Sequence, residues 1–196
     1  MRWIGIGLGI LIHVGVVAAT IPSPNVFLQE VFTTVSSYTQ TVSNNVQSTQ
    51  DIIAAIQTVV EDSVDFELMA KLSVGRSAWS EAKPKERLKF VKTFKSHLFD
   101  TYLSQFLDYE SANLVVKFGE TKQRGNKAKV PCVIQSGDSQ FSGAFKVYLN
   151  QSKWKIYDVD MEGVSLIAAF RVQFSAPVRD GGLVNLTRKL ERMNRS

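Results

Sequence analysis

Cysteine is nearly absent from this sequence. Cys132 is the only one among 196 residues, so no intramolecular disulfide can form and the core must supply the stability. It lies within residues 130–134 (VPCVI), an apolar run typical of a strand. A reactive thiol needs a basic partner and some exposure. We therefore expect a buried, inert cysteine.

Patterns for metal and nucleotide binding are also missing. His97 is the only histidine outside the N-terminal segment, and neither a dinucleotide-binding glycine motif nor a P-loop occurs. Residues 163–167 (GVSLI) supply only the first half of the G-x-S-x-G motif of serine hydrolases. Ser165 is predicted instead to cap a helix after a sharp turn at Gly163. We expect no metal and no cofactor.

Two carboxylates, Asp158 and Asp160, would lie on one face of a strand. Carboxylates at a strand end commonly form hydrogen bonds or salt bridges, and this is our primary interpretation. The alternative is a lipid-acting hydrolase that uses Asp158 or Asp160 with Ser165 or His97.

The longest uncharged stretch is residues 3–19 (WIGIGLGILIHVGVVAA), which follows Arg2 and precedes two prolines. A short basic region, a long apolar region and a small-residue exit are the pattern of a secretory signal peptide, with Val17 and Ala19 before the cleavage site. We predict a signal peptide at residues 1–19 and export. An uncleaved anchor is the alternative, because the stretch reaches the lower limit for a membrane-spanning helix.

The rest of the chain has an ordinary globular composition. Hydrophobic residues make up 44% and charged residues 21%, which excludes wholesale disorder and predicts one domain over residues 20–196. Cleavage would lower the net charge from +5 to +4 by removing Arg2. An exported basic protein meets anionic headgroups, acidic polymers or acidic partner patches, and we expect no nucleic acid among its partners. Charge that serves solubility alone is the alternative.

Helices are predicted before and after a group of strands. Apolar spacing indicates a long helix over residues 25–50, a further helical segment over 51–60, and a helix over 66–74 that Asp65 caps. The strongest helix opens at Pro84, and its apolar positions cover more than half its circumference. Such a helix must face two apolar surfaces, and one of them can be a cavity.

From about residue 112 the apolar period changes from 3.6 to 2. Strands are expected near residues 114–118, 127–135, 140–150 and 154–161, with turns between the last three, followed by helices over 165–174 and 183–193. The fold class is therefore α+β, with helices packed on a curved, four-stranded antiparallel sheet.

Several motifs together resemble the MlaC family of periplasmic phospholipid-binding proteins, also called toluene-tolerance auxiliary proteins. The first block is DFELMA at residues 65–70, GRSAW at 75–79 and PKERLKF at 84–90. The second is WKIYDV at residues 154–159, EGVSL at 162–166 and RVQF at 171–174. Their order and spacing resemble the family from about residue 26 to 192.

The resemblance implies an α+β domain that encloses a cavity for acyl chains and has no enzymatic activity. It implies a periplasmic carrier that shuttles phospholipid between an inner-membrane ABC transporter complex with MCE domains and an outer-membrane lipoprotein complex. One branch of the family is associated with hopanoids, so another lipid is an alternative ligand. We expect a monomer. An adaptor with a filled core and no ligand is a further alternative.

For the ligand contacts we predict mainly the wide helix and the sheet face that it opposes. The lipid-binding candidates are Leu72, Phe90, Phe94, Leu98, Tyr102, Phe145, Val147, Leu149, Tyr157, Val164 and Ile167. Basic residues near element ends, Lys71, Arg76, Arg171 and Arg179, are candidates for headgroup contact or docking.

Overall fold

The computed structural model describes residues 21–43, 49–110 and 115–195, so the predicted signal peptide lies outside the described residues. The helices before the sheet are α1 (Pro24–Ser43), α2 (Thr49–Ser63), α3 (Phe66–Val74), α4 (Arg76–Glu81) and α5 (Pro84–Glu110). The strands are β1 (Val115–Phe118), β2 (Lys122–Arg124), β3 (Lys127–Ser136), β4 (Ser139–Asn150), β5 (Lys153–Met161) and β6 (Val164–Ser165), and α6 (Leu166–Met193) follows them.

Local signals place several helix ends as predicted. The carboxylate of Asp65 accepts the backbone N–H of Leu68 at 2.8 Å and so caps α3, and α5 begins at Pro84. In the N-terminal region, α1 is described as far as Ser43. The next described helix, α2, begins at Thr49, two residues before the predicted start of the second helical segment. The short α4 was not predicted.

The C-terminal helices are continuous except for a kink at the predicted break. Within α6, Gly181 and Gly182 leave the helical conformation, and Gly182 has a φ of +61° that favours glycine. The hydroxyl of Ser165 accepts the N–H of Ala168 at 3.2 Å, which confirms Ser165 as the cap of α6.

The sheet is antiparallel and open, with β1 and β2 both paired to β3, then β4, β5 and β6 in order. The four long strands and the two turns between β3, β4 and β5 were predicted, but the strand count of four is wrong, because the described sheet has six strands. Strand β2 (KQR) is exposed on both faces, and β6 has two residues, so neither has an apolar period to detect.

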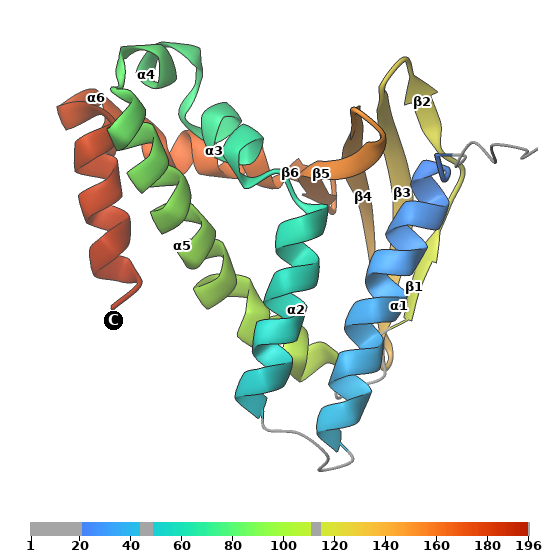
Figure 1. Cartoon of the computed structure of the whole chain (residues 1–196). Helices are drawn as coiled ribbons and strands as arrows, with labels where there is room; N and C mark the ends of the chain where they lie inside the picture. The colour runs from blue at the N-terminus through green and yellow to red at the C-terminus, as the bar shows by residue number, and fades with distance from the viewer. Residues whose placement is uncertain (1–20, 44–48, 111–114, 196) are drawn as a thin grey trace, which may run out of the picture.

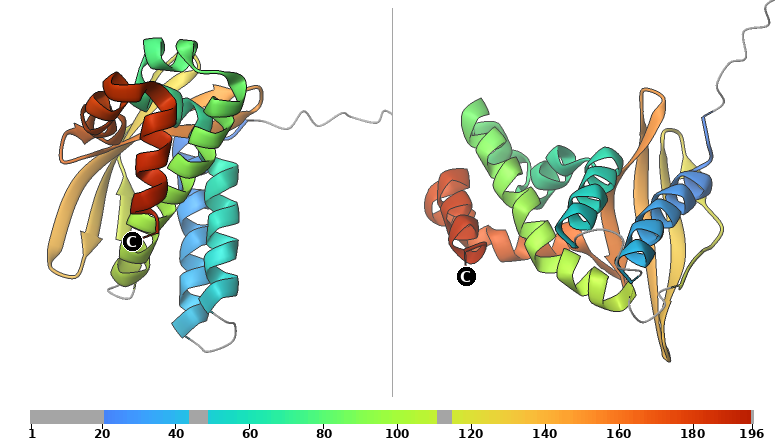
Figure 2. Two further views of the ribbon diagram at one scale, coloured as in Figure 1. Left: turned by 90° about the vertical axis from the view of Figure 1, so that its left-hand side faces the viewer. Right: turned by 60° about the horizontal axis from the view of Figure 1, so that its bottom comes forward.

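Helices cover one face of the sheet, as Figures 1 and 2 show. In Figure 1 and in the right-hand view of Figure 2, α2 lies between α1 and α5, and α1 overlaps the sheet. Three buried clusters result. The first cluster holds α3, α4, α5 and α6 together, and the second lies between α1 and the sheet. A small third cluster (Val35, Ile52 and Ile56) lies between α1 and α2. None of the described helices is long and apolar enough to cross a bilayer.

Candidate functional site

A cavity of about 310 Å³ lies between the helices and the inner face of the sheet. This volume is at the lower end for ligand pockets and about twice that of a roughly 150 Å³ apolar cavity known to stay dry and bind benzene. Five helices, two strands and the α2–α3 junction supply the lining side chains: Val31, Phe32, Val35, Ile56, Val60, Ser63, Val64, Phe66, Met69, Leu98, Phe99, Tyr102, Phe145, Ile156, Val159 and Leu166.

The lining has almost no polar character. None of its described side chains is charged, and the hydroxyl of Ser63 is already engaged, since it donates to the carbonyl of Val59 at 2.7 Å. Such a surface has no free polar group to bind a polar substrate, and the transfer of hydrocarbon from water into it is favourable. The cavity is therefore suited to an apolar ligand.

Among the lining residues that the structure describes, only Tyr102 is exposed, with 42% of its surface accessible, so it marks a place where the cavity meets solvent. Burial of part of the ring raises the pKa of the Tyr102 phenol above its usual value. The hydroxyl therefore remains protonated at neutral pH and can donate a hydrogen bond to an oxygen at this end of the cavity.

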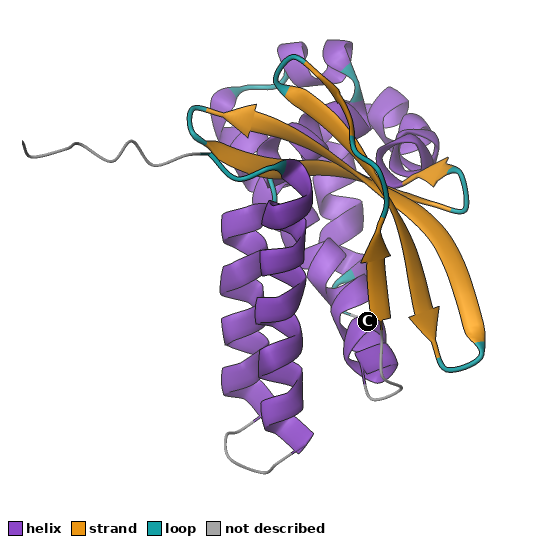
Figure 3. Ribbon diagram, turned by 90° about the vertical axis from the view of Figure 1, so that its right-hand side faces the viewer, coloured by secondary structure: helices purple, strands orange, loops and turns teal. Residues whose placement is uncertain are grey.

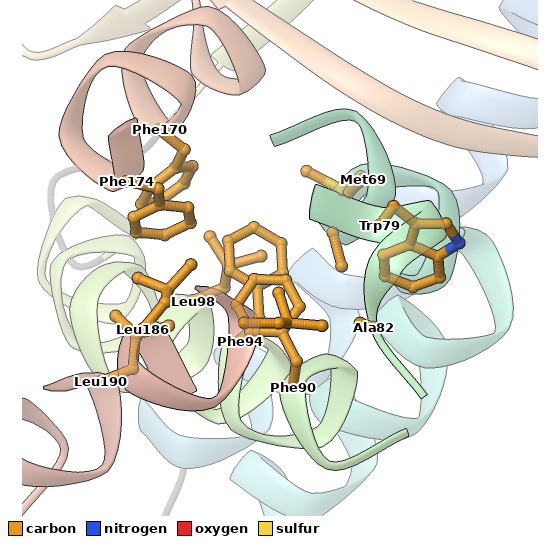
Figure 4. Close-up of a cluster of buried hydrophobic side chains, with 12 residues drawn as sticks. Met69, Trp79, Ala82, Phe90, Phe94, Leu98, Phe170, Phe174, Leu186 and Leu190 are labelled. Carbon is orange, nitrogen blue, oxygen red and sulfur yellow. The ribbon is translucent and has the colours of Figure 1, made fainter. Parts of the chain in front are cut away.

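The helix α5 contacts two apolar surfaces, as its wide apolar face predicts. Its first half carries Phe90 and Phe94, which are fully buried against Phe170 and Phe174 of α6 with ring centroids 5.2 to 6.2 Å apart. Figure 4 shows these rings in one cluster with Leu98. Leu98 belongs to this cluster and also lines the cavity, so α5 connects the helical core to the site.

The helices α1 and α2 form a wall of the cavity that the residue assignments from sequence missed. Phe32 of α1 packs edge-on against Phe118 and Phe145 of the sheet, with centroids 5.6 and 5.4 Å apart. Val35 and Ile56 hold α1 and α2 together behind this contact. The apolar spacing of residues 25–60 was the available signal, but it did not show which residues line a cavity.

The structure distributes the predicted lipid-binding residues among several places. Leu98, Tyr102 and Phe145 line the cavity. Phe90 and Phe94 lie in the helical core, Val147 and Leu149 pack in the cluster between α1 and the sheet, and Ile167 is buried at the start of α6. Leu72 and Tyr157 are half-buried outside the lining, and Val164 is 60% exposed. The structure does not test ligand contact at these eight positions, and the core position of Phe94 favours the alternative that it is a plain core residue.

The predicted basic residues lie outside the cavity lining. Lys71 and Arg76 are exposed, and the Arg171 guanidinium donates to the carbonyl of Leu72 at 2.6 and 3.1 Å. Arg179 is exposed beside Asp180, with 3.9 Å between the charged atoms. Headgroup contact or docking by these four residues remains a prediction.

Asp158 forms the centre of a buried polar cluster at the junction of β5 and α6. Its carboxylate is 2.7 Å from the ammonium of Lys146, accepts the hydroxyl of Ser165 at 2.6 Å and accepts the N–H of Ile167 at 3.1 Å. Asp160 pairs with Lys129 at 3.3 Å. These contacts match the structural interpretation of the two carboxylates.

Two groups of the hydrolase alternative are in contact, because the hydroxyl of Ser165 donates to Asp158, but the third, His97, is engaged elsewhere. The imidazole of His97 is 2.9 Å from the side-chain oxygen of Asn194, near the end of α6, while Ser165 caps the beginning of the same helix. Burial raises the pKa of the Cys132 thiol to about 11, so it stays protonated, as a structural cysteine does. Within residues 21–43, 49–110 and 115–195 no group of side chains is arranged to hold a metal.

Comparisons with known proteins agree with this geometry. A family model described as MlaC protein matches residues 29–192. No curated protein matches the sequence. Among solved structures, the fold is similar to that of the phospholipid-binding protein from Ralstonia solanacearum, determined in complex with a phospholipid, with a TM-score of 0.77 at 19% identity. The similarity covers 87% of this chain and 96% of that chain.

Proposed function

The chain belongs to the MlaC family, and from this premise we propose that it is a carrier whose cavity takes the acyl chains of a phospholipid. The observation that carries the proposal is the apolar cavity of about 310 Å³, which is open to solvent on one side and whose described lining holds no charged group. The Ralstonia protein of similar fold, solved with a phospholipid, supports the same ligand class.

Burial of hydrocarbon accounts for the affinity that a carrier needs. Each methylene moved from water to an apolar site contributes about 0.8 kcal/mol, so even part of an acyl chain is held firmly. The polar headgroup remains near water, and the exposed side of Tyr102 is the proposed position for it. Release then requires a partner that opens the cavity or buries the acyl chains equally well, because otherwise the bound lipid has a lower free energy in the carrier than in the partner.

We place this carrier in the periplasm, after export and cleavage near Ala19. Its proposed partners are the inner-membrane ABC transporter complex with MCE domains and the outer-membrane lipoprotein complex, between which it moves lipid as a monomer. Lys71, Arg76, Arg171 and Arg179 are proposed contacts for the headgroup or for these partners. A hopanoid or another apolar lipid is the competing ligand.

Native mass spectrometry of the mildly purified protein tests the ligand class. We expect co-purifying phospholipid, and reloading from phospholipid vesicles after its removal. A hopanoid mass in place of phospholipid would change the ligand. A protein that carries no lipid and accepts none from vesicles would contradict the carrier function.

A pair of tryptophan variants on α5 tests the cavity itself. Leu98 lines the cavity, whereas Leu88 lies on the same helix and is 73% exposed. Leu98→Trp should exclude lipid, while Leu88→Trp should bind it as the wild type does. Circular dichroism and thermal melting establish that both variants fold, and Val60→Phe provides a smaller obstruction if Leu98→Trp unfolds. Unchanged lipid content in both folded cavity variants would exclude this cavity as the site.

A further inference from the structure

The outer face of the sheet, opposite the cavity, carries a concentration of exposed basic side chains. Residues directly across from each other in a sheet share a face, and Lys122 lies opposite Lys129 as Arg124 lies opposite Lys127. Lys153 of β5 is on the same face. Figure 3 views the sheet from this side, with α3, α5 and α6 behind it. These five residues are called the basic sheet face below.

The acidic residues of the same face are withdrawn from solvent. The side chains of Asp158 and Asp160 are 4% and 14% exposed, and they pair with Lys146 and Lys129. Glu120, in the loop before β2, is exposed but does not lie on a strand. The exposed charge on the described strands here is therefore positive.

Most of this positive charge has no counterion within the described chain. Lys122, Arg124, Lys127 and Lys153 form no ion pair there, although the ammonium of Lys127 lies 5.9 Å from the ring centroid of Tyr157. Like charges directly opposite each other destabilise a sheet. This arrangement therefore lowers the stability of the free protein, and an anionic partner would relieve the repulsion.

Protection of a sheet edge does not account for the whole face. Lysines on an edge strand discourage pairing with other chains, and this explains charge on β2. Lys127 and Lys129 lie on β3 where it is paired with β2 on one side and with β4 on the other, whereas Lys153 lies on a part of β5 that is paired only with β4. Edge protection therefore does not explain the charge of Lys127 and Lys129.

We propose that the basic sheet face adsorbs the protein to an anionic membrane surface. Clusters of four to eight Lys and Arg residues attract anionic headgroups, and each residue contributes separately. A specific protein partner would instead favour aromatic and other apolar anchors, since lysine is depleted at interface cores. No exposed large hydrophobic residue lies on β2, β3 or β4, and on the same face of β1 the only one is Val115, opposite Gln135. The cavity is on the other side of the sheet, so adsorption leaves Tyr102 accessible.

Co-sedimentation of the full chain with vesicles tests this proposal. Vesicles of equal parts phosphatidylglycerol and phosphatidylcholine are compared with pure phosphatidylcholine, which also reports any binding through apolar residues 3–19. We expect the partition coefficient on the anionic vesicles to exceed that on the neutral ones at about 20 mM salt. At about 500 mM salt the difference should disappear, because ions screen charges beyond a few ångströms.

A matched pair of triple variants locates the binding to this face. The face variant is Lys122→Gln, Arg124→Gln and Lys127→Gln; the control variant is Lys85→Gln, Arg188→Gln and Lys189→Gln, three exposed positions on α5 and α6. Both lower the net charge by three. The face variant should lose roughly 100-fold in partitioning to anionic vesicles, and the control much less.

The outcomes separate this inference from the proposed carrier function. Absence of wild-type binding to anionic vesicles at low salt, or equal binding by the face variant, would overturn it and leave an acidic protein partner as the occupant. An equal loss in both variants would attribute binding to net charge and overturn it too. Lipid bound in the cavity, measured by native mass spectrometry, should be the same in all three proteins.

Discussion

Tyr148 of β4 donates a hydrogen bond from its phenol to Asp65, the residue that caps α3. The other carboxylate oxygen of Asp65 accepts the N–H of Leu68, and the backbone N–H of Asp65 donates to the carbonyl of Ile156 at 2.8 Å. One residue thus joins the helix that carries Phe66 into the cavity to the strands that form the opposite wall. Asp65 is therefore a structural support of the site.

The first prediction concerns this hydrogen bond. Tyr148→Phe should lower the free energy of unfolding by about 1 kcal/mol at pH 7, because a hydrogen bond to a charged group is lost at a partly exposed position. The pKa of Tyr148 is raised from 10.0 to about 12, mainly by burial and to a smaller extent by the hydrogen bond to Asp65. Folding therefore favours the protonated phenol.

The dependence on pH has a definite sign. The stability contributed by the raised pKa is complete below about pH 10 and is lost as the pH rises through about 12. Urea titrations of the wild type and Tyr148→Phe at pH 7, 10 and 11.5 measure it. We expect the difference between the two proteins to shrink at the highest pH; a difference that grows there would contradict the assigned cause.

The second prediction distinguishes core from cavity on α5. Phe94 is fully buried among Phe90, Phe170 and Phe174 and does not line the cavity. Phe94→Ala should therefore cost about 3 to 5 kcal/mol of stability. The amount of lipid per folded molecule should stay the same in native mass spectrometry.

The matched substitution is Phe32→Ala, which removes a half-buried ring from the cavity wall. It should reduce retention of lipid during delipidation, with a smaller loss of stability than Phe94→Ala. If Phe94→Ala lost more lipid and less stability than Phe32→Ala, Phe94 would belong to the ligand site.

The third prediction concerns the buried ion pair. Asp158→Asn should destabilise the protein by about 2 to 4 kcal/mol, since it leaves the ammonium of Lys146 without its carboxylate in a partly buried position. Combining it with Lys146→Met should recover part of this loss, which a double-mutant cycle by urea denaturation measures. Strict additivity of the two losses would show that the pair is not coupled.

The fourth prediction decides between helix capping and catalysis at Ser165. Ser165→Ala removes the hydrogen bond from the N–H of Ala168 and the one that the hydroxyl donates to Asp158, and should cost about 2 kcal/mol. Incubation with phospholipid vesicles followed by product analysis should show no difference from the wild type. Hydrolysis by the wild type that disappears in Ser165→Ala would establish the hydrolase alternative.

Much of the secondary structure could be predicted because its signals are local. Asp65 before an apolar run, Pro84 at a helix start and Gly181-Gly182 within a helical pattern each act on the backbone within a few residues. The same holds for the turns that join β3 to β4 and β4 to β5. Strand β2 escaped prediction because its polar residues are held by pairing with β3 and carry no apolar period.

The lining of the cavity was less predictable. Phe94 and Leu98 occupy the same apolar face of one helix, and their spacing does not show that only Leu98 reaches the cavity. The difference arises from the position of α6, whose Phe170 and Phe174 cover Phe94. The walls formed by α1 and α2 depend in the same way on Phe32 meeting Phe145, a residue more than 100 positions later.

The sequence by itself determined the order of the longer helices and strands, the caps of α3 and α6 and the burial of Cys132, because these follow from backbone preferences and apolar periods over short distances. The tertiary structure alone decided which aromatic side chains enclose a cavity and which fill the core. It also decided that Lys122, Lys129 and Lys153 share one face, because strand register brings together residues that are distant along the chain. Packing and register between remote segments leave no local trace in the sequence.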